Sequence, residues 1–452
     1  MLGTLAVLAC AFPIGFNSGM PPPAPKEVIS RIDPDYVRGA IERLAGFGTR
    51  HSLSDQDHPT RGIGAARAWL LEEFKGHNLG GFMRVSFEEF EAPVGPRIPR
   101  GVKFANVVAV LPGTMPEAAG RRYYVVGHYD SMPSSVMDPE SDAPGANDDA
   151  SGTAVVLAIA RALGGHPCES TIVFLCTVGE EQGLIGAKHH AEQAAARGED
   201  IRAVLSNDIV GDPLGPGGDP RLAARHVVRV FSEGIPRLAT AEELARIRNF
   251  GGESDSKSRQ LARFVAEVGK KEGLAVEALL IFRQDRLLRG GDHSAFNEAG
   301  FPAVRFTEVY EDYRHQHQTP RTEKGPDGEE VVYGDHPEFV DAGYVADVAK
   351  LNAAALLHLA NAPSEPRRAR IITARLENET RLRWDPSPEP DVAGYEVVWR
   401  MTTDSQWIRS RDVGLVTEAV VPASKDNHFF GVRAYDKDGY RSPVVFCGAG
   451  RD

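Results

Sequence analysis

The sequence is poor in three features that would assign it to a specialised class. After the first twenty residues, no uncharged apolar run is long enough to cross a bilayer. Only 4 of the 452 residues are cysteine and none stands at CxxC spacing, so the chain has no disulfide framework. The formal net charge is −12 with basic and acidic residues interleaved, which argues against a nucleic-acid surface.

What the sequence does contain is typical of a globular protein with several domains. Hydrophobic residues make up 42% and charged residues 25%, which is the usual balance for a soluble chain. A chain of 452 residues exceeds what one hydrophobic core usually fills. We therefore expect two or three domains, and no internal repeat is visible.

The N-terminus, MLGTLAVLACAFPIGFNSGMPPPAPK, is apolar and has no Lys or Arg before Lys26. It resembles the apolar region of a secretory signal that lacks its charged start, followed by a Pro-rich linker. Residues 1–33 are therefore expected to be a signal-like segment and linker of a secreted or periplasmic protein. Cys10 is a candidate lipoprotein acylation site, and a disordered tail is the alternative.

From Pro34 the chain alternates between helical and extended patterns. Amphipathic or apolar helices are expected at residues 36–44, 62–77, 151–163, 256–270 and 340–362. Strands are expected at residues 85–91, 104–113, 122–130, 170–181, 203–208 and 226–234. Such alternation predicts an α/β domain with a mostly parallel sheet flanked by helices, spanning residues 34–362.

Acidic residues and one histidine stand where three of these buried strands end. GHYDS follows the first strand, TVGEEQGL the second and SNDIVGD the third, while PGANDDASG precedes a helix. In parallel sheets, ligands bind at the carboxyl ends of the strands. Buried carboxylates without partners are costly, so cations must lie among them, most plausibly a pair of zinc ions. The residues concerned are His128, Asp130, Asp148, Asp149, Glu180, Glu181 and Asp208.

The C-terminal part has a different character. After PSEPRRAR, short alternating strands with turn signals predict an all-β sandwich over residues 367–452. Trp384, Tyr395, Val397 and Val432 are its expected core residues. The segment resembles a fibronectin type III domain, and no catalytic role is expected for it.

Residues 211–320 are less regular and are expected to hold the last strands and an insertion beside the pocket. This region contains the loop LLRGGDHSAFNEAGFPAVRFTEV and the histidine-bearing loop YEDYRHQHQTPRT.

The order of the motifs over about residues 34–362 resembles the co-catalytic di-zinc exopeptidases. That family includes bacterial leucyl-type aminopeptidases, glutamate carboxypeptidase and the transferrin-receptor ectodomain. Its pattern is HxD, then a DD pair before SG, then EE, then ND and a late His, which all occur here in that order. The resemblance implies two zinc ions and a peptide substrate.

Five ligands and two further roles follow from this resemblance. His128, Glu181 and Asp208 are implied as ligands, and Asp148 bridges two ions about 3.5–4 Å apart. Asp130 is implied to accept the ring N–H of His128 and so to fix its tautomer. Glu180 is implied as the general base, while the DASG segment from Asp149 also suits the N-cap of the next helix.

The last ligand is either His315 or His317. The family carries a Thr five positions after this His, and Thr322 selects His317, although Arg321 then replaces an expected acid. Asp292 and His293 match a DH pair near the family's pocket, as supporting or substrate-side residues. Tyr310 and Tyr313 are candidate donors to the oxyanion.

The implied activity is that of an aminopeptidase, in which a metal-bridging hydroxide attacks the peptide bond next to a free N-terminus. A carboxypeptidase or dipeptidase of the same fold would need a basic clamp, for which Arg283, Arg286, Arg289 and Arg305 are candidates. Two further alternatives are a non-catalytic binding homologue and a mononuclear enzyme similar to glutaminyl cyclase.

Overall fold

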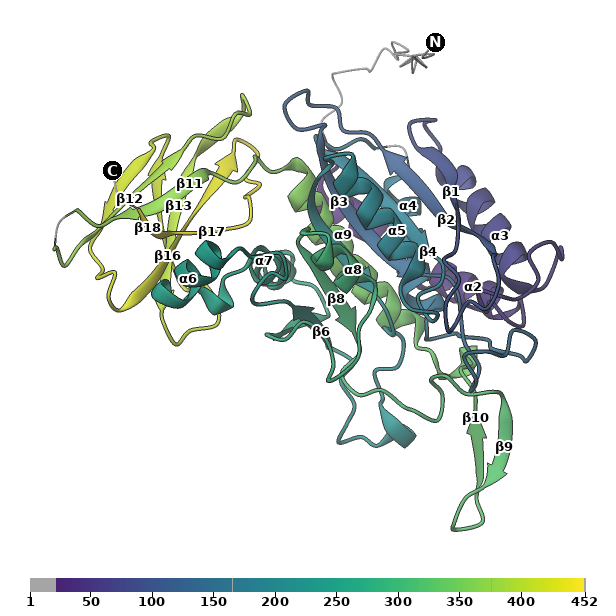
Figure 1. Cartoon of the computed structure of the whole chain (residues 1–452). Coiled ribbons are helices and arrows are strands. Elements are labelled where there is room, and N and C mark those ends of the chain that lie inside the picture. Colours follow the sequence, from purple (N-terminus) through teal and green to yellow (C-terminus); the bar gives the residue numbers. More distant parts are fainter. Residues whose placement is uncertain (1–21, 165, 375, 451–452) are drawn as a thin grey trace, which may run out of the picture.

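The computed structural model describes residues 22–164, 166–374 and 376–450, which form two parts that lie side by side (Figure 1). The larger part is built on one 8-stranded sheet with helices on both faces. The smaller, C-terminal part contains two 4-stranded sheets. This arrangement confirms the predicted α/β fold followed by an all-β unit. Within the described ranges, no helix is both long enough and apolar enough to cross a membrane.

The large sheet is mixed, with a parallel centre. Its strand order is β1-β2-β4-β3-β5-β8-β6-β7. Strands β4, β3, β5 and β8 run parallel to one another, whereas β2 is antiparallel to β4 and β6 is antiparallel to β8. The strands are β1 (Arg84–Glu91), β2 (Lys103–Leu111), β3 (Arg121–His128), β4 (Thr171–Thr177), β5 (Asp200–Asn207), β6 (Val227–Ser232), β7 (Glu277–Ile281) and β8 (Ala303–Thr307).

Apolar clusters on both faces of the sheet hold the helices against it. Because side chains alternate along a strand, Val125 of β3 faces one cluster while Tyr124 and Val126 face the other. The first face carries α1 (Pro25–Ser30), α2 (Pro34–Ala45), α3 (Gly62–His77), α4 (Ala150–Leu163), α7 (Lys257–Glu272) and α9 (Ala342–Asn361). The second face carries α5 (Ile185–Ala196) and α8 (Asp292–Glu298).

Two expectations about this part were wrong. The linker expected up to residue 33 includes helix α1, whose Val28 is fully buried in the main core, so the first domain begins earlier than residue 34. The segment read as the loop LLRGGDHSAFNEAGFPAVRFTEV contains α8 and the buried strand β8. Arg305 in the middle of β8 interrupted the apolar run that marks a buried strand. The signal-like residues 1–21, including Cys10, lie outside the described residues.

The C-terminal part packs one sheet against the other around an apolar cluster. The sheet orders are β15-β12-β11-β18 and β14-β13-β16-β17. The expected core residues Trp384, Tyr395, Val397 and Val432 all lie in that cluster. The strands are β11 (Arg367–Ile372), β12 (Thr380–Asp385), β13 (Val392–Met401), β14 (Arg409–Gly414), β15 (Glu418–Val421), β16 (His428–Asp436), β17 (Val445–Phe446) and β18 (Gly448–Gly450).

The two parts meet beside α7 and the preceding α6 (Ala241–Phe250) (Figure 1). Paired charges line this seam. Arg400 of β13 donates to both carboxylate oxygens of Asp255, at 2.9 and 2.7 Å. The indole N–H of Trp407 donates to the side chain of Gln260 on α7 at 2.9 Å. These contacts fix the β-sheet part against the α/β part on the side of β6 and β7.

A hairpin of β9 (Arg321–Lys324) and β10 (Glu330–Tyr333) projects from the α/β part (Figure 1). It follows directly on the loop that carries His315 and His317. The hairpin therefore connects that loop to α9.

Candidate metal centre

Three adjacent strands bring the predicted acidic residues to one edge of the sheet. Strand β3 lies between β4 and β5 and runs parallel to both. His128 is the last residue of β3, Glu180 and Glu181 follow the end of β4, and Asp208 follows β5 directly. Because parallel strands end at the same edge, these residues converge, as the sequence predicts.

Asp148 joins the two halves of this cluster. Its Oδ1 lies 3.2 Å from Nε2 of His128, and its Oδ2 lies 2.9 Å from Nε2 of His317. The side chain is 5% exposed. Burial disfavours its ionised form, but the His317 and His128 imidazoles outweigh burial and hold the pKa of Asp148 well below its usual range. One carboxylate thus faces two separate nitrogen donors.

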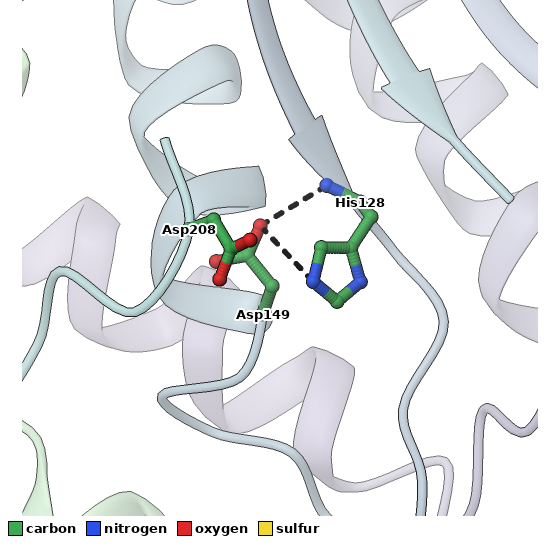
Figure 2. A group of neighbouring side chains, drawn as sticks. All are labelled: His128, Asp149 and Asp208. Atoms are coloured by element: carbon green, nitrogen blue, oxygen red, sulfur yellow. Dashed lines mark hydrogen bonds and ion pairs between the residues drawn. The ribbon is translucent and has the colours of Figure 1, made fainter. Parts of the chain in front are cut away.

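Two groups of potential ligand atoms lie on either side of Asp148. In one, His128, Asp149 and Asp208 offer atoms within 4.8 Å of one another, as Figure 2 shows. In the other, Asp148, Glu181 and His317 do the same, with His317 Nε2 lying 3.1 Å from Glu181 Oε1. Both groups mix imidazole nitrogen with carboxylate oxygen, the donor set that zinc takes in proteins.

Asp149 is already engaged by the backbone around it. Its Oδ2 accepts from the backbone N–H of His128 at 3.0 Å and lies 4.0 Å from the imidazole Nε2 (Figure 2). Its Oδ1 accepts from the backbone N–H groups of Gly152 at 2.9 Å and Ile209 at 3.3 Å. Asp149 therefore caps α4, as expected, and ties its N-terminus to the ends of β3 and β5.

The buried polar atoms of the cluster fit a metal. Nε2 of His128 and Oε1 of Glu181 are buried and have no hydrogen-bond partner among the described residues. Orphaned buried donors and acceptors cost roughly 1–3 kcal/mol each, so a folded chain keeps them only where something completes them. A divalent cation between these atoms removes that cost, and zinc fits the donor set.

Asp130 connects His128 to the turn that carries the two glutamates. Its carboxylate accepts from the backbone N–H groups of Glu180 at 3.3 Å and Glu181 at 3.2 Å. The hydroxyl of Ser52 donates to it at 3.0 Å, and Nδ1 of His128 lies 3.5 Å from its Oδ1. The same Nδ1 lies 3.2 Å from the Asp130 carbonyl oxygen. Asp130 thus holds the imidazole and the Glu180–Glu181 turn together.

Glu180 lines a cavity of about 370 Å³ directly above the cluster. Asp148, Glu181, Asp208 and His317 line the same cavity. Burial, with Asp208, Glu181 and Asp292 adding to it against the effect of His128, raises the pKa of the Glu180 carboxyl well above its usual value. A carboxylate with raised proton affinity beside the ligands has the property that a general base needs.

The structure separates the two candidate histidines of the 310–320 loop. His317 points into the cluster with a backbone φ of 51°. His315 instead stacks on Phe339, with ring centroids 3.7 Å apart. Leu184 and Ile209, which border the cluster, also have positive φ, at 62° and 60°. Such conformations are uncommon outside glycine and gather at functional sites.

The remaining sequence-based candidates lie at the edge of the site or outside it. Asp292 is buried and accepts a short hydrogen bond from the Thr177 hydroxyl, while Nε2 of His293 lies 2.9 Å from the carbonyl oxygen of Gln284. Neither residue lines the cavity, so we assign both a supporting role. Tyr310 and Tyr313, the candidate donors to the oxyanion, are 43% and 65% exposed and are not among the residues that line this cavity.

Sequence reasoning missed Asp335 and Gln316, which hold a ligand in place, and considered Arg305 only as a clamp for the substrate. Arg305 is fully buried, with Nη2 lying 2.7 Å from Oδ1 of Asp208. Asp335 accepts from the backbone N–H groups of Asn147 at 2.8 Å and Asp148 at 2.7 Å. Gln316 donates to Oδ2 of Asp148 at 3.0 Å. No local pattern marks them, because their partners come from distant parts of the chain.

The four arginines considered as a clamp for a substrate carboxylate lie in different surroundings. Arg286 and Arg289 line the cavity above the cluster, whereas Arg283 lines a neighbouring cavity. Arg305 is buried between Asp208 and Asp285 and cannot reach a substrate.

An α/β sheet with imidazoles and carboxylates at its carboxyl edge, below a polar cavity, defines a metal-dependent hydrolase. Residues 106–224 match the model of peptidase family M28. A probable zinc metalloprotease from Leptosphaeria maculans is 44% identical over 436 residues, which cover 95% of this chain and 98% of that protein. The chain belongs to peptidase family M28.

Solved structures show the same fold. LapB from Legionella pneumophila superposes with a TM-score of 0.52 at 16% identity, covering 74% of each chain. An aminopeptidase from Aneurinibacillus sp. strain AM-1 gives a TM-score of 0.50 at 14% identity, over 75% of this chain and 96% of that one. Family and fold together confirm the predictions of a zinc-dependent metallopeptidase and of a zinc exopeptidase fold.

Proposed function

We propose that the protein is an aminopeptidase that holds two zinc ions and removes N-terminal residues from peptides. The observation that carries this proposal is the position of Asp148, whose two oxygens face the imidazoles of His128 and His317 at 3.2 and 2.9 Å. A carboxylate shared in this way suits two neighbouring dications, because the common anion offsets their mutual repulsion.

The ligands divide around Asp148. His128 and Asp208 would hold one ion, and Glu181 and His317 the other. Asp149 is the competing candidate at the first ion, but both of its oxygens already accept backbone N–H groups. We therefore assign Asp149 to positioning the loop and Asp148 to bridging.

Bound zinc would supply Lewis-acid activation of the scissile carbonyl and of the attacking water. Glu180 lines the cavity beside the ligands and is the side chain placed to take the proton from that water. The same carboxyl then delivers the proton to the leaving amine. Asp130 keeps Glu180 in reach, because it accepts the backbone N–H groups of both glutamates.

Metal content and substrate choice test this proposal together. We expect two equivalents of zinc per chain and cleavage of amino-acid amides with a free N-terminus, but not of N-acetylated ones. One tightly bound equivalent would point to a mononuclear enzyme of the glutaminyl cyclase kind. The variant Asp148→Asn should lose zinc from both positions, whereas His315→Asn should keep it, because His315 stacks on Phe339 outside the cluster.

A carboxypeptidase or dipeptidase is the second candidate, because Arg286 and Arg289 line the cavity. Cleavage of N-blocked peptides at the C-terminal bond would select a carboxypeptidase, and cleavage of dipeptides alone would select a dipeptidase. A non-catalytic homologue is disfavoured, since every expected ligand type and Glu180 are present in one cluster.

The remaining expectations complete the proposal. The peptidase unit extends to about residue 362, and residues 367–452 form a fibronectin type III-like spacer, in line with the two packed sheets of that part. The apolar N-terminus suggests that the protein is secreted or periplasmic. Fractionation of cells that express the full chain, followed by N-terminal sequencing of the mature protein, tests that location.

A further inference from the structure

The cavity above the cluster is unusual in its lining. Leu184 is the one apolar side chain among the residues that line it, whereas ligand cavities are mostly apolar. Four basic side chains line it as well, namely Arg97, Lys188, Arg286 and Arg289. The acids that line it are Asp148, Glu180, Glu181 and Asp208, all of which belong to the proposed metal and base positions.

Arg97 and Lys188 have no acidic partner in the part of the chain that the structure describes. Nη1 of Arg97 donates to the carbonyl oxygen of Glu181 at 2.7 Å, and Nζ of Lys188 donates to the carbonyl oxygen of Gly183 at 3.0 Å. No carboxylate oxygen of the described residues lies within 4.0 Å of the Arg97 guanidinium or of the Lys188 ammonium, which is the limit for an ion pair. Both side chains are exposed, so the packing of the core does not require them there.

The opposite wall also has an excess of positive charge. Arg286 and Arg289 each pair with Glu311 at 2.7 Å, and Arg229 pairs with the same carboxylate at 2.9 Å. Arg286 also pairs with Asp285 at 3.1 Å, so three guanidinium groups face two carboxylates on this wall. Once cations occupy the cluster below, the walls of the cavity attract an anion rather than an apolar side chain.

The walls come from segments far apart in the sequence. Arg97 lies in the β1–β2 loop and Lys188 in the first turn of α5, whereas Arg286 and Arg289 lie between β7 and α8. A volume of about 370 Å³ is at the lower end of the range for small-ligand sites. A group held between these walls therefore lies close to the scissile bond, because the proposed ligands and the basic side chains line the same cavity.

We propose that the cavity binds a carboxylate of the substrate, so that short peptides with an acidic group next to the scissile bond are preferred. The inference rests on the proposed function and names its substrate class. The carboxylate has two possible sources, the free C-terminus of a dipeptide or an acidic side chain on the residue after the scissile bond. Arg97 and Lys188 are then residues that determine specificity, since guanidinium and ammonium groups hydrogen-bond carboxylates strongly.

Binding to the zinc-loaded, full-length Glu180→Gln protein tests the proposal without turnover. The first pair of probes is Ala-Ala and its C-terminal amide, and the second pair is Ala-Glu-amide and Ala-Gln-amide. We expect the charged member of at least one pair to bind about tenfold more tightly, which corresponds to about 1.4 kcal/mol. The pair that shows the preference identifies the source of the carboxylate.

The double variant Arg97→Gln/Lys188→Gln should abolish the preference by lowering the affinity for the charged probe to that for its neutral counterpart. The control Arg100→Gln/Lys103→Gln likewise removes one arginine and one lysine charge, but from positions that do not line the cavity, and should keep the preference. The preference should also weaken in 0.5 M salt, since exposed charges are screened.

Equal binding within each pair would overturn the proposal, and so would a preference that survives the double variant. The same ratios, measured as kcat/KM with the wild-type protein, give a second readout if the Glu180→Gln protein fails to fold. A wild-type protein that cleaves none of the probes but binds the charged ones more tightly would refute the aminopeptidase, while leaving this inference standing.

Discussion

Buried charges serve opposite purposes at the metal cluster and at the seam between the two parts of the molecule. At the seam, Asp255 receives both hydrogen bonds of Arg400, and Arg121 lies 3.0 Å from Glu389. At the cluster, several buried carboxylates face two imidazoles and Arg305. A buried charge is tolerable only when an opposite charge accompanies it. At the seam Asp255 has Arg400 and Arg263 as partners, so this site needs no added ion and is structural, whereas the carboxylates of the cluster outnumber its cationic side chains and point to metal ions.

The largest expected effect tests the functional side of this comparison. Glu180→Gln should lower kcat by about 10²–10⁴-fold, because it removes the proton acceptor but no proposed ligand. Zinc content, measured by mass spectrometry, should not change. A variant that keeps full turnover would remove Glu180 from the mechanism.

The same substitution should stabilise the ion-free protein rather than weaken it. Burial and the acids nearby raise the pKa of Glu180, so its ionised form is less favourable in the folded state than in the unfolded state, and this costs stability as the pH rises above the ordinary glutamate range. Thermal unfolding of the ion-free Glu180→Gln protein at neutral pH should therefore show a higher melting temperature than that of the ion-free wild type. Destabilisation would indicate that Glu180 is structural.

The second prediction concerns the loss of the Arg400–Asp255 ion pair at the seam. Arg400→Met leaves Asp255 with only Arg263, at 3.2 Å, as a charged partner and should destabilise the protein by about 3 kcal/mol. Denaturant unfolding measures this change. Arg409→Met, at an exposed position on β14, is the matched control and should change stability little. Peptide hydrolysis by folded Arg400→Met protein should stay at the wild-type level, because the seam contributes nothing to the cluster.

Removing zinc should act on the cluster alone. With free zinc at 100 times its dissociation constant, binding should stabilise the folded state by about 2.7 kcal/mol per ion. A chelator should therefore lower the melting temperature, and added zinc should restore it. The shift should have the same size in wild-type and Arg400→Met proteins, and a much smaller shift in the variant would show that the two regions are coupled.

The smallest expected effect concerns pH. Burial disfavours protonation of His317, but Glu181 and Asp148 outweigh burial and raise its pKa to about 11 in the ion-free protein. The imidazole is therefore protonated at neutral pH, and zinc must displace that proton. Zinc affinity should rise about tenfold per pH unit for each proton released between pH 6 and 8. Competition with a chelator at several pH values measures this slope, and an affinity that does not change with pH would contradict it.

Local patterns predicted the elements that position the cluster. The helix expected at residues 62–77 is α3 with the same bounds, and the strands expected to end at residues 130, 181 and 208 are β3, β4 and β5, which end one to four residues earlier. These elements combine a continuous apolar run with a polar residue at the end, so the signal lies within a few neighbouring residues. Strand β8 and helix α8 were missed because Arg305, Asp292 and His293 are polar and yet buried.

The sequence alone determined which residue types gather at the strand ends, because strand periodicity and motif order are local properties of the chain. It did not decide the insertion of antiparallel β2 beside β4, the positive φ that turns His317 inward or the pairing of Arg305 with Asp208. Each of these depends on contacts between segments many residues apart, which exist only once the sheet has formed. Tertiary structure therefore decided which carboxylates pair with cationic side chains of the protein and which remain free to bind metal ions.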